Sequence, residues 1–433
     1  MFQCTLYIRS EKAEKLTCCS IRFVLPKYSR MRIYLFRLLA PFLFTTLAAC
    51  SEQKTTATEP EKPASSAPVD TTSAPTVAAP APDTTAVQDV AAYLAGQPVS
   101  QRSDLRPLTA LPAWQAFAAD ADKSWTNYHN TRTNRIQQWA ATELDSVRRS
   151  SSTVFYPFSG PDLLNAYTMF PTAQTYVLVG LEPVGTVPRR STLENPKLFS
   201  AIKASLWSVL NFSFFRTNDM AVDLKSVELD GALPLMMLFA TRTGNQVTDI
   251  RYLQLNTQGQ MSEADTMTIH RPGPKIIPGV EMKLRDAKGQ EKTVYYFSAD
   301  LSDWKLGTTK DAILQYVRTL GPVVTYIKSA TYLMHKPYFS KVRNLILDRS
   351  NFILQDDSGI AMKYFPASDW QFTYYGTYKR PINLFAKHYQ PTLTQVYTDS
   401  VHRPRPLPFG TGYNWRQNDS NLLLARRTKT VAE

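Results

Sequence analysis

Apolar residues recur with two different periods after residue 88, and the change of period separates expected helices from expected strands. Residues 88–96 fit one short helix, and Trp114, Phe117, Trp125, Ile136 and Trp139 recur at helical spacing, which predicts one or two amphipathic helices over 111–144. The short apolar runs 153–158 and 175–181 are rich in β-branched and aromatic residues, which favours strands. A helix over 161–170 between them completes a β-turn-α-β unit.

The same two periods continue to the end of the chain. They predict helices over 198–215 and 233–241, a strand over 247–255, a hairpin of 280–284 and 293–298 around Lys288-Gly289, a helical stretch over 310–347 broken near 321–322 and 336–337, a second hairpin of 352–355 and 360–365 with its turn at 356–359, and strands over 370–378 and 421–425. This mixture predicts an α/β body with one main mixed sheet, flanking helices and added hairpins.

The body is preceded by a segment of different composition. Residues 51–87 consist mainly of Thr, Ala, Pro, Ser and Glu, which cannot bury enough apolar surface to fold, so we expect a disordered tether over 50–87. The body then spans 88–433, with a helical lead-in over 88–150 and a sheet-containing core over 151–433.

Residues 31–49 have the features of an export signal. Arg32 and Arg37 form a positive head, and the apolar run 38–49 is shorter than the roughly 20 residues that cross a bilayer. The run ends in Leu47-Ala48-Ala49-Cys50, and here the sequence resembles bacterial lipoprotein precursors, whose lipobox ends in an acylated Cys. The alternative is a chance Cys after an apolar helix. Residues 1–30 are basic and do not suit a signal start, so translation is expected to begin at Met31.

The resemblance implies a protein anchored by lipid at Cys50 in a bacterial cell envelope, facing out of the cytoplasm at the outer membrane. The other cysteines, Cys4, Cys18 and Cys19, precede Cys50, so a mature chain would have no disulfide and no Cys-based metal site or nucleophile. The full chain has a net charge of +13 and is 43% hydrophobic, which excludes wholesale disorder and a multi-span membrane protein. Beyond the leader the charge is only modestly basic, and we expect no nucleic-acid partner.

The β-turn-α-β unit holds the most informative candidate site. Ser159 suits the N-cap of the helix, Asp162 suits a capping-box acid, and Gly160 permits close backbone approach, so the helix N-terminus could receive an anion or a polar ligand. Glu182 ends the next strand about 20 residues after Gly160, where nucleotide-binding folds place the carboxylate that holds a ribose.

This unit is similar in layout to the first half of a Rossmann-like fold, of the methyltransferase kind in particular. It departs from the Gly-x-Gly-x-x-Gly fingerprint, since a single glycine is present, and an exported protein has no ready supply of nucleotide cofactor. We therefore expect no cofactor. The competing interpretation is structural, with Ser159 capping a helix and Glu182 ending a buried strand.

Three other patterns bear on chemistry. The turn at 356–359 brings together two acids and a serine, which could do acid/base work or serve only as a hairpin turn. The five histidines lie far apart in the sequence, so no metal site is expected. Near the C-terminus, aromatic residues could stack on a glycan such as peptidoglycan or could belong to the core: Trp370, Tyr374, Tyr413 and Trp415.

No catalytic signature is present in the sequence, and three function classes stay open. A binding or scaffold module of the envelope comes first. A hydrolase or transferase with a pocket at Ser159–Asp162, including a Rossmann-like methyltransferase-type relic, comes second, and an assembly factor with an envelope-protein partner comes third.

Overall fold

The computed structural model describes residues 84–212, 224, 227–399, 401 and 403–429. The export signal, Cys50 and the tether up to residue 83 lie outside the described residues. The first helix, α1 (Thr84–Leu94), begins four residues before the expected start of the body, because residues 84–87 belong to it.

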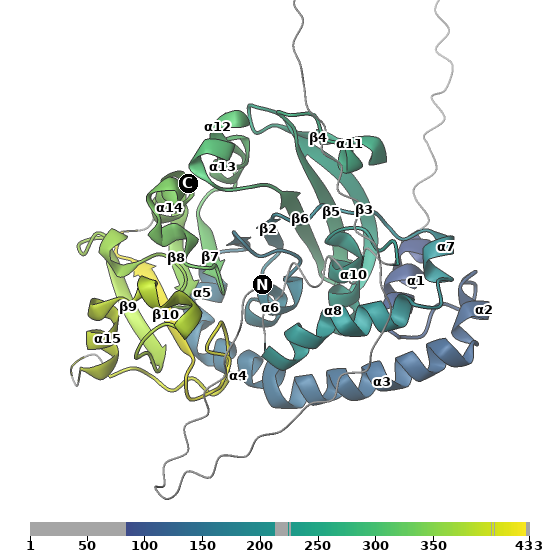
Figure 1. Ribbon diagram of the computed structural model, residues 1–433, viewed down its shortest axis with the longest axis horizontal. Coiled ribbons are helices and arrows are strands. Elements are labelled where there is room, and N and C mark those ends of the chain that lie inside the picture. The colour runs from purple at the N-terminus through teal and green to yellow at the C-terminus, as the bar shows by residue number, and fades with distance from the viewer. Residues whose placement is uncertain (1–83, 213–223, 225–226, 400, 402, 430–433) are drawn as a thin grey trace, which may run out of the picture. The chain divides into compact units, whose positions relative to one another are not determined.

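Ten of the described segments are strands of one mixed sheet in the order β4-β3-β5-β6-β2-β1-β7-β8-β10-β9 (Figure 1). Its centre is parallel and consists of β6 (Glu291–Ser298), β2 (Thr175–Gly180), β1 (Thr153–Tyr156), β7 (Val323–Ile327) and β8 (Ser350–Gln355). The predicted mixed α/β class with one main sheet is confirmed.

Antiparallel strands extend both edges of this parallel centre. On one edge lie β5 (Ile277–Arg285), β3 (Gln246–Leu255) and β4 (Met261–Glu263). On the other lie β10 (Asn421–Arg427) and β9 (Trp370–Gly376). The predicted hairpin around Lys288-Gly289 is the β5–β6 pair, and the final two strands are also present where expected.

Helices cover both faces of the sheet, because successive strand residues point to opposite sides. Tyr156 and Leu178 belong to one apolar cluster, while their neighbours Phe155 and Val177 belong to the other. The first cluster includes residues of α1, α3 (Pro112–Tyr128), α4 (Asn134–Glu143), α6 (Leu163–Met169), α8 (Leu198–Phe212) and α10 (Leu233–Arg242). The second includes residues of α12 (Asp303–Thr308), α13 (Ala312–Arg318) and α14 (Ser340–Arg349), which are neighbours in Figure 1.

The remaining described elements are short. They are α2 (Arg106–Thr109), the π-helical turn η1 (His129–Thr133), α5 (Asp145–Ser150), α7 (Arg190–Leu193), α11 (Thr266–His270), α15 (Pro391–Thr398), and the 3-10 turns η2 (Leu333–His335), η3 (Pro337–Phe339), η4 (Met362–Tyr364) and η5 (Asn383–His388).

The prediction of a helical stretch over 310–347 is wrong at its centre. Residues 323–327 form β7, which is buried throughout and pairs in parallel with both β1 and β8. A short apolar run has no period that separates a buried strand from a helix, and here the β-branched residues and the preceding Gly321-Pro322 favour the strand.

The second predicted hairpin is also wrong. β8 ends at Gln355, but residues 360–365 form no strand, and β10 takes the antiparallel place beside β8. Asp356–Gly359 is therefore a buried loop at the carboxyl end of a parallel strand. A local turn signal of Asp, Ser and Gly is the same for both arrangements.

The five parallel strands have a recognisable order. Numbered among themselves along the chain, they follow the order 3-2-1-4-5, as in the doubly wound nucleotide-binding sheet. The chain turns from one side of β1 to the other between β6 and β7. In such sheets ligands bind outside the carboxyl ends of the strands at this switch point.

Candidate functional site

A pocket opens at the carboxyl ends of β1, β2, β6 and β7, and we call it the edge pocket. Its walls include residues 158–160 after β1, 180–182 at the end of β2, 299–302 after β6 and 328–329 after β7. Its volume is about 540 Å³, within the range of roughly 300–1,000 Å³ of small-molecule sites. The structure thus brings the four candidate residues Ser159, Gly160, Asp162 and Glu182 together in one cavity.

The turn after β1 fits closely against the end of β2. Phe158 and Gly160 both have positive φ, 60° and 52°. A Cβ on Gly160 would lie 2.8 Å from Oε1 of Glu182, and a Cβ on Gly180 would lie 2.7 Å from Cα of Gly160. These two glycines therefore let the Glu182 carboxylate lie directly against the backbone of the turn.

The helix after this turn begins later than predicted. Asp162, and not Ser159, is the N-cap of α6: its Oδ1 accepts hydrogen bonds from the Asn165 backbone N–H at 3.1 Å and from Asn165 Nδ2 at 2.8 Å. The Ser159 hydroxyl instead donates to the carbonyl of Gly160 at 2.9 Å. Because a carboxylate already occupies the helix N-terminus, an anionic ligand would meet repulsion there, contrary to the expected anion site.

Asp162 also forms a buried ion pair with Lys328. Their side chains are 2% and 1% exposed, and Lys328 Nζ lies 2.8 Å from Asp162 Oδ2. The Tyr156 hydroxyl donates to the same oxygen at 2.9 Å, and burial, with Asp162 beside it, raises the pKa of Tyr156. Since Asp162 follows β1 and Lys328 follows β7, the pair connects the two strands at the switch point.

The opposite wall of the edge pocket offers hydrogen-bond acceptors. Glu182 is half-buried, and Tyr296 donates to its backbone carbonyl at 2.8 Å and approaches its Oε2 at 3.3 Å. Asp300, after β6, is also half-buried and accepts from the backbone N–H of Ser302 at 2.9 Å. Two carboxylates at neighbouring strand ends can accept hydrogen bonds from hydroxyl or amino groups of a ligand.

Two serine hydroxyls on the pocket wall have no hydrogen-bond partner among the residues that the structure describes. They belong to Ser302, at the N-cap of α12, and Ser329, after β7. A buried hydroxyl without a partner is costly, so both groups are available to a ligand. Lys328, Ser302 and Ser329 carry no local sequence signal of a site, because only the sheet brings them together.

A second buried polar cluster adjoins the edge pocket, at the loop after β8. Asp356 Oδ2 accepts from the backbone N–H of Ser329 at 2.8 Å, and Asp357 accepts from the Tyr332 hydroxyl and from Asn421 Nδ2 at 3.0 Å. Burial, and the charge of Asp356, raise the pKa of Asp357 to about 7. Burial also raises the pKa of Asp356, against the opposing effects of its hydrogen bonds and of Lys328.

The structure brings two of the five histidines together. The rings of His335 and His388 lie 5.5 Å apart, and His388 stacks on Tyr332 at 5.1 Å. Burial lowers the pKa of His335 to about 4, so its imidazole is neutral near pH 7. Among the described residues no group of three acidic, histidine or cysteine side chains could hold a metal ion.

The four C-terminal aromatic residues do not form one groove. Trp370 and Tyr374 are buried, Trp370 against Phe365 and Tyr374 against Tyr397. Tyr413 lines the edge pocket and donates to the carbonyl of Ser329 at 2.8 Å, whereas Trp415 is half-buried outside that pocket. The core interpretation therefore holds for Trp370 and Tyr374.

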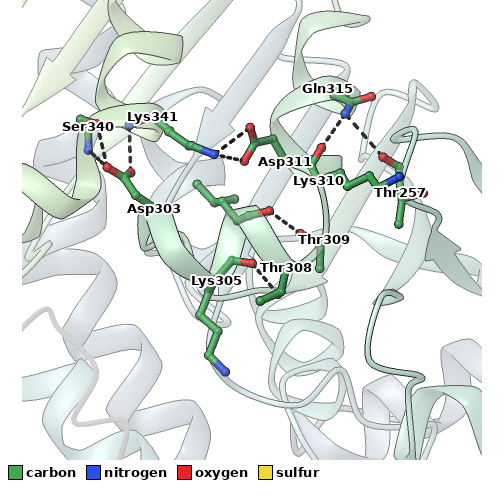
Figure 2. Close-up of polar contacts among 11 residues, drawn as sticks. Thr257, Asp303, Lys305, Thr308, Thr309, Lys310, Asp311, Gln315, Ser340 and Lys341 are labelled. Carbon is green, nitrogen blue, oxygen red and sulfur yellow. Dashed lines mark hydrogen bonds and ion pairs between the residues drawn. The ribbon is translucent and has the colours of Figure 1, made fainter.

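Asp303 fixes the two helices that flank the mouth of the edge pocket. Its carboxylate accepts from the Ser340 backbone N–H and hydroxyl at 3.1 and 2.7 Å, and from the Lys341 backbone N–H at 3.0 Å (Figure 2). Lys341 then pairs with Asp311 at 2.7 Å. α12 is thereby attached to the N-terminus of α14.

No protein-family model, curated protein or solved structure matches this chain. None of the helices in the described ranges is both long and apolar enough to span a bilayer.

Replacing Lys328 by Met should strongly destabilise the protein. Met keeps much of the apolar volume but leaves the buried Asp162 charge without its cation, so we expect the free energy of unfolding in urea to fall by about 3–5 kcal/mol. The matched control is Arg149→Met, which breaks the exposed pair with Asp145 (2.6 Å) and should have little effect. The double variant Asp162→Asn/Lys328→Met should recover part of the loss. If Lys328→Met lost as little stability as the control Arg149→Met, this role of the ion pair would be contradicted.

Replacing Asp357 by Asn should remove a pH dependence of stability. The folded state holds a proton on Asp357 up to about pH 7, whereas an unfolded chain releases it near pH 4, so folding takes up a proton in this window. This contribution to stability therefore falls as pH rises from about 4 to 7, by at most about 1.4 kcal/mol per pH unit. In urea titrations at several pH values, the free energy of unfolding of the variant should increase relative to that of the native protein as pH rises. A difference between the two proteins that does not change with pH would contradict the assignment.

Replacing Asp303 by Ala should loosen the start of α14. The change removes three hydrogen bonds and a negative charge at a helix N-terminus, so we expect a loss of about 1–2 kcal/mol and faster hydrogen exchange at the amides of Ser340 and Lys341. Asp348→Ala, on the same helix in an exposed pair with Arg318, is the control. Unchanged exchange at these amides would show that Asp303 does not hold the helix.

Proposed function

We propose that the edge pocket binds an adenine nucleoside without phosphate groups, such as adenosine or an S-adenosyl compound. The observation that carries the proposal is the position of two carboxylates. Asp162 occupies the N-terminus of α6, where dinucleotide-binding folds hold a pyrophosphate, while Glu182 lies just after the end of β2, near the position where they hold a ribose. The ribose position is thus available and the phosphate position is filled.

The charges around the edge pocket favour the same ligand class. Asp162, Glu182 and Asp300 line it together with Lys328 and Lys336, and Asp162 already neutralises Lys328. A pyrophosphate would add negative charge to this surplus of carboxylates, whereas a neutral nucleoside or a cationic sulfonium would not.

Each polar group of the wall has a counterpart on such a ligand. The Glu182 carboxylate can accept from the ribose hydroxyls and the Asp300 carboxylate from the exocyclic amino group of adenine. The hydroxyls of Ser302 and Ser329 gain partners on binding. S-Adenosylmethionine, when bound, would supply an activated methyl group; the residues named here bind and orient the nucleoside.

This proposal combines two of the function classes that the sequence left open, a binding module and a methyltransferase-type relic. The strand order 3-2-1-4-5 and the position of the edge pocket support it. The lipid anchor at Cys50 and the envelope location stay predictions. An exported protein would meet free nucleosides more readily than S-adenosylmethionine, which is why the proposal names the whole ligand class.

Titration calorimetry on the full chain tests the proposal. Adenosine, S-adenosylmethionine and S-adenosylhomocysteine are the probes, with ATP and NAD for comparison. We expect at least one of the first three to bind at least about 10-fold more tightly than ATP or NAD. Glu182→Gln should weaken that binding by about 10- to 100-fold, because it removes a charged acceptor. Glu263→Gln, an exposed acid on β4, should not change binding.

Two outcomes would overturn the proposal. One is stronger binding of ATP or NAD than of the nucleosides, since a pyrophosphate would then be tolerated at Asp162. The other is nucleoside binding that Glu182→Gln leaves unchanged, or no binding of any of these probes.

A further inference from the structure

Large apolar side chains gather at the mouth of the edge pocket. Leu181, Trp304 and Tyr338 are 71%, 63% and 48% exposed, and all three line this one cavity. They come from three separate segments, after β2, on α12 and before α14. Soluble proteins usually scatter exposed apolar residues, and a group of them around one opening marks an interaction site. We call these three residues the apolar rim.

Lysines accompany the aromatic residues of the apolar rim. Lys305 Nζ lies 4.4 Å from the ring centre of Trp304, and Lys336 Nζ lies 5.6 Å from that of Tyr338. Neither ammonium has a salt-bridge partner in the described part of the chain. In Figure 2 the Lys305 side chain extends away from the contacts of α12.

Two acids that lie close to Lys305 in the sequence are already engaged. Asp303 accepts three hydrogen bonds from the start of α14, and Asp311 pairs with Lys341 (Figure 2). Lys305 and Lys336 therefore place positive charge beside the apolar rim, and its two flanking helices are held together by Asp303. A fixed surface of this kind loses little conformational entropy when it binds.

We propose that the apolar rim docks onto an anionic phospholipid surface, with Trp304, Tyr338 and Leu181 at the level of the headgroups. Trp and Tyr favour this interface because one part of each ring system is apolar and another part is polar. Each lysine close to an anionic bilayer increases the affinity for the bilayer by about 5-fold. This contact places the mouth of the edge pocket against the membrane. It is independent of the nucleoside proposal and of acylation at Cys50.

Quenching by brominated lipids tests the docking in the full chain. Vesicles of brominated phosphatidylcholine, with or without phosphatidylglycerol, are mixed with the native protein, with Trp304→Phe, and with Trp207→Phe as a matched control. Trp207 is 53% exposed on α8, outside the edge pocket. We expect lipid-dependent quenching that needs phosphatidylglycerol, that falls with salt, and that Trp304→Phe reduces but Trp207→Phe does not.

A second variant separates electrostatic attraction from loss of structure. Lys305→Gln/Lys336→Gln removes two ammonium charges and keeps side chains of similar length, and it should lower the docked fraction on phosphatidylglycerol vesicles, with an equilibrium constant on the order of 30-fold smaller. Quenching that is independent of phosphatidylglycerol, or equal losses in Trp304→Phe and Trp207→Phe, would overturn the proposal. So would self-association through the rim without lipid. Glu182→Gln should leave docking intact, so failure here is distinguishable from failure of the nucleoside proposal.

Discussion

The buried ion pair between Asp162 and Lys328 lies where the chain changes direction across the sheet. It joins the loop after β1 to the loop after β7, and the same Asp162 oxygen accepts from Tyr156. Two buried charges offset the cost of leaving water only when they are in close contact. The ion pair therefore limits the conformations of both loops. Because these loops form the base of the edge pocket, the pair sets the shape and the charge of the site at once.

The polar groups around this pair are short of positive charge. Asp356 and Asp357 follow the neighbouring strand β8 and are buried, and Lys328 is the cation that favours the ionised form of Asp356 against the effect of burial. A buried carboxyl that has no cation of its own keeps its proton to a higher pH, and this describes Asp357. The interior thus disfavours anionic ligands, while Lys305 and Lys336, beside the rim, attract anions. The two regions of the site have opposite preferences.

These preferences give the proposed ligand and the proposed membrane contact separate places. The nucleoside would occupy the wall formed by Glu182 and Asp300, and lipid would contact the rim formed by Leu181, Trp304 and Tyr338. Asp303 connects the pocket wall to the rim, because it holds α12 against α14 (Figure 2). α12 carries Trp304 of the rim and directly follows Ser302 of the pocket wall. A rigid frame between an interior site and its mouth is what a protein needs to receive a ligand from a surface.

Local patterns were sufficient for the elements whose residues carry their own signals. The helices within 112–143, the strands β1 and β2, the β5–β6 hairpin and the closeness of Gly160 to Glu182 all followed from apolar period, turn residues and spacing. β7, the loop at Asp356–Gly359, the N-cap at Asp162 and its pairing with Lys328 did not. The N-cap is made locally with Asn165, but the other three depend on a partner far away in the chain: a parallel neighbour on both sides, an antiparallel strand from the C-terminus, or a cation that follows Asp162 by more than 160 residues. Parallel pairing and the burial of charge depend on which distant segments come into contact. The short-range periodicity of apolar residues does not determine these contacts.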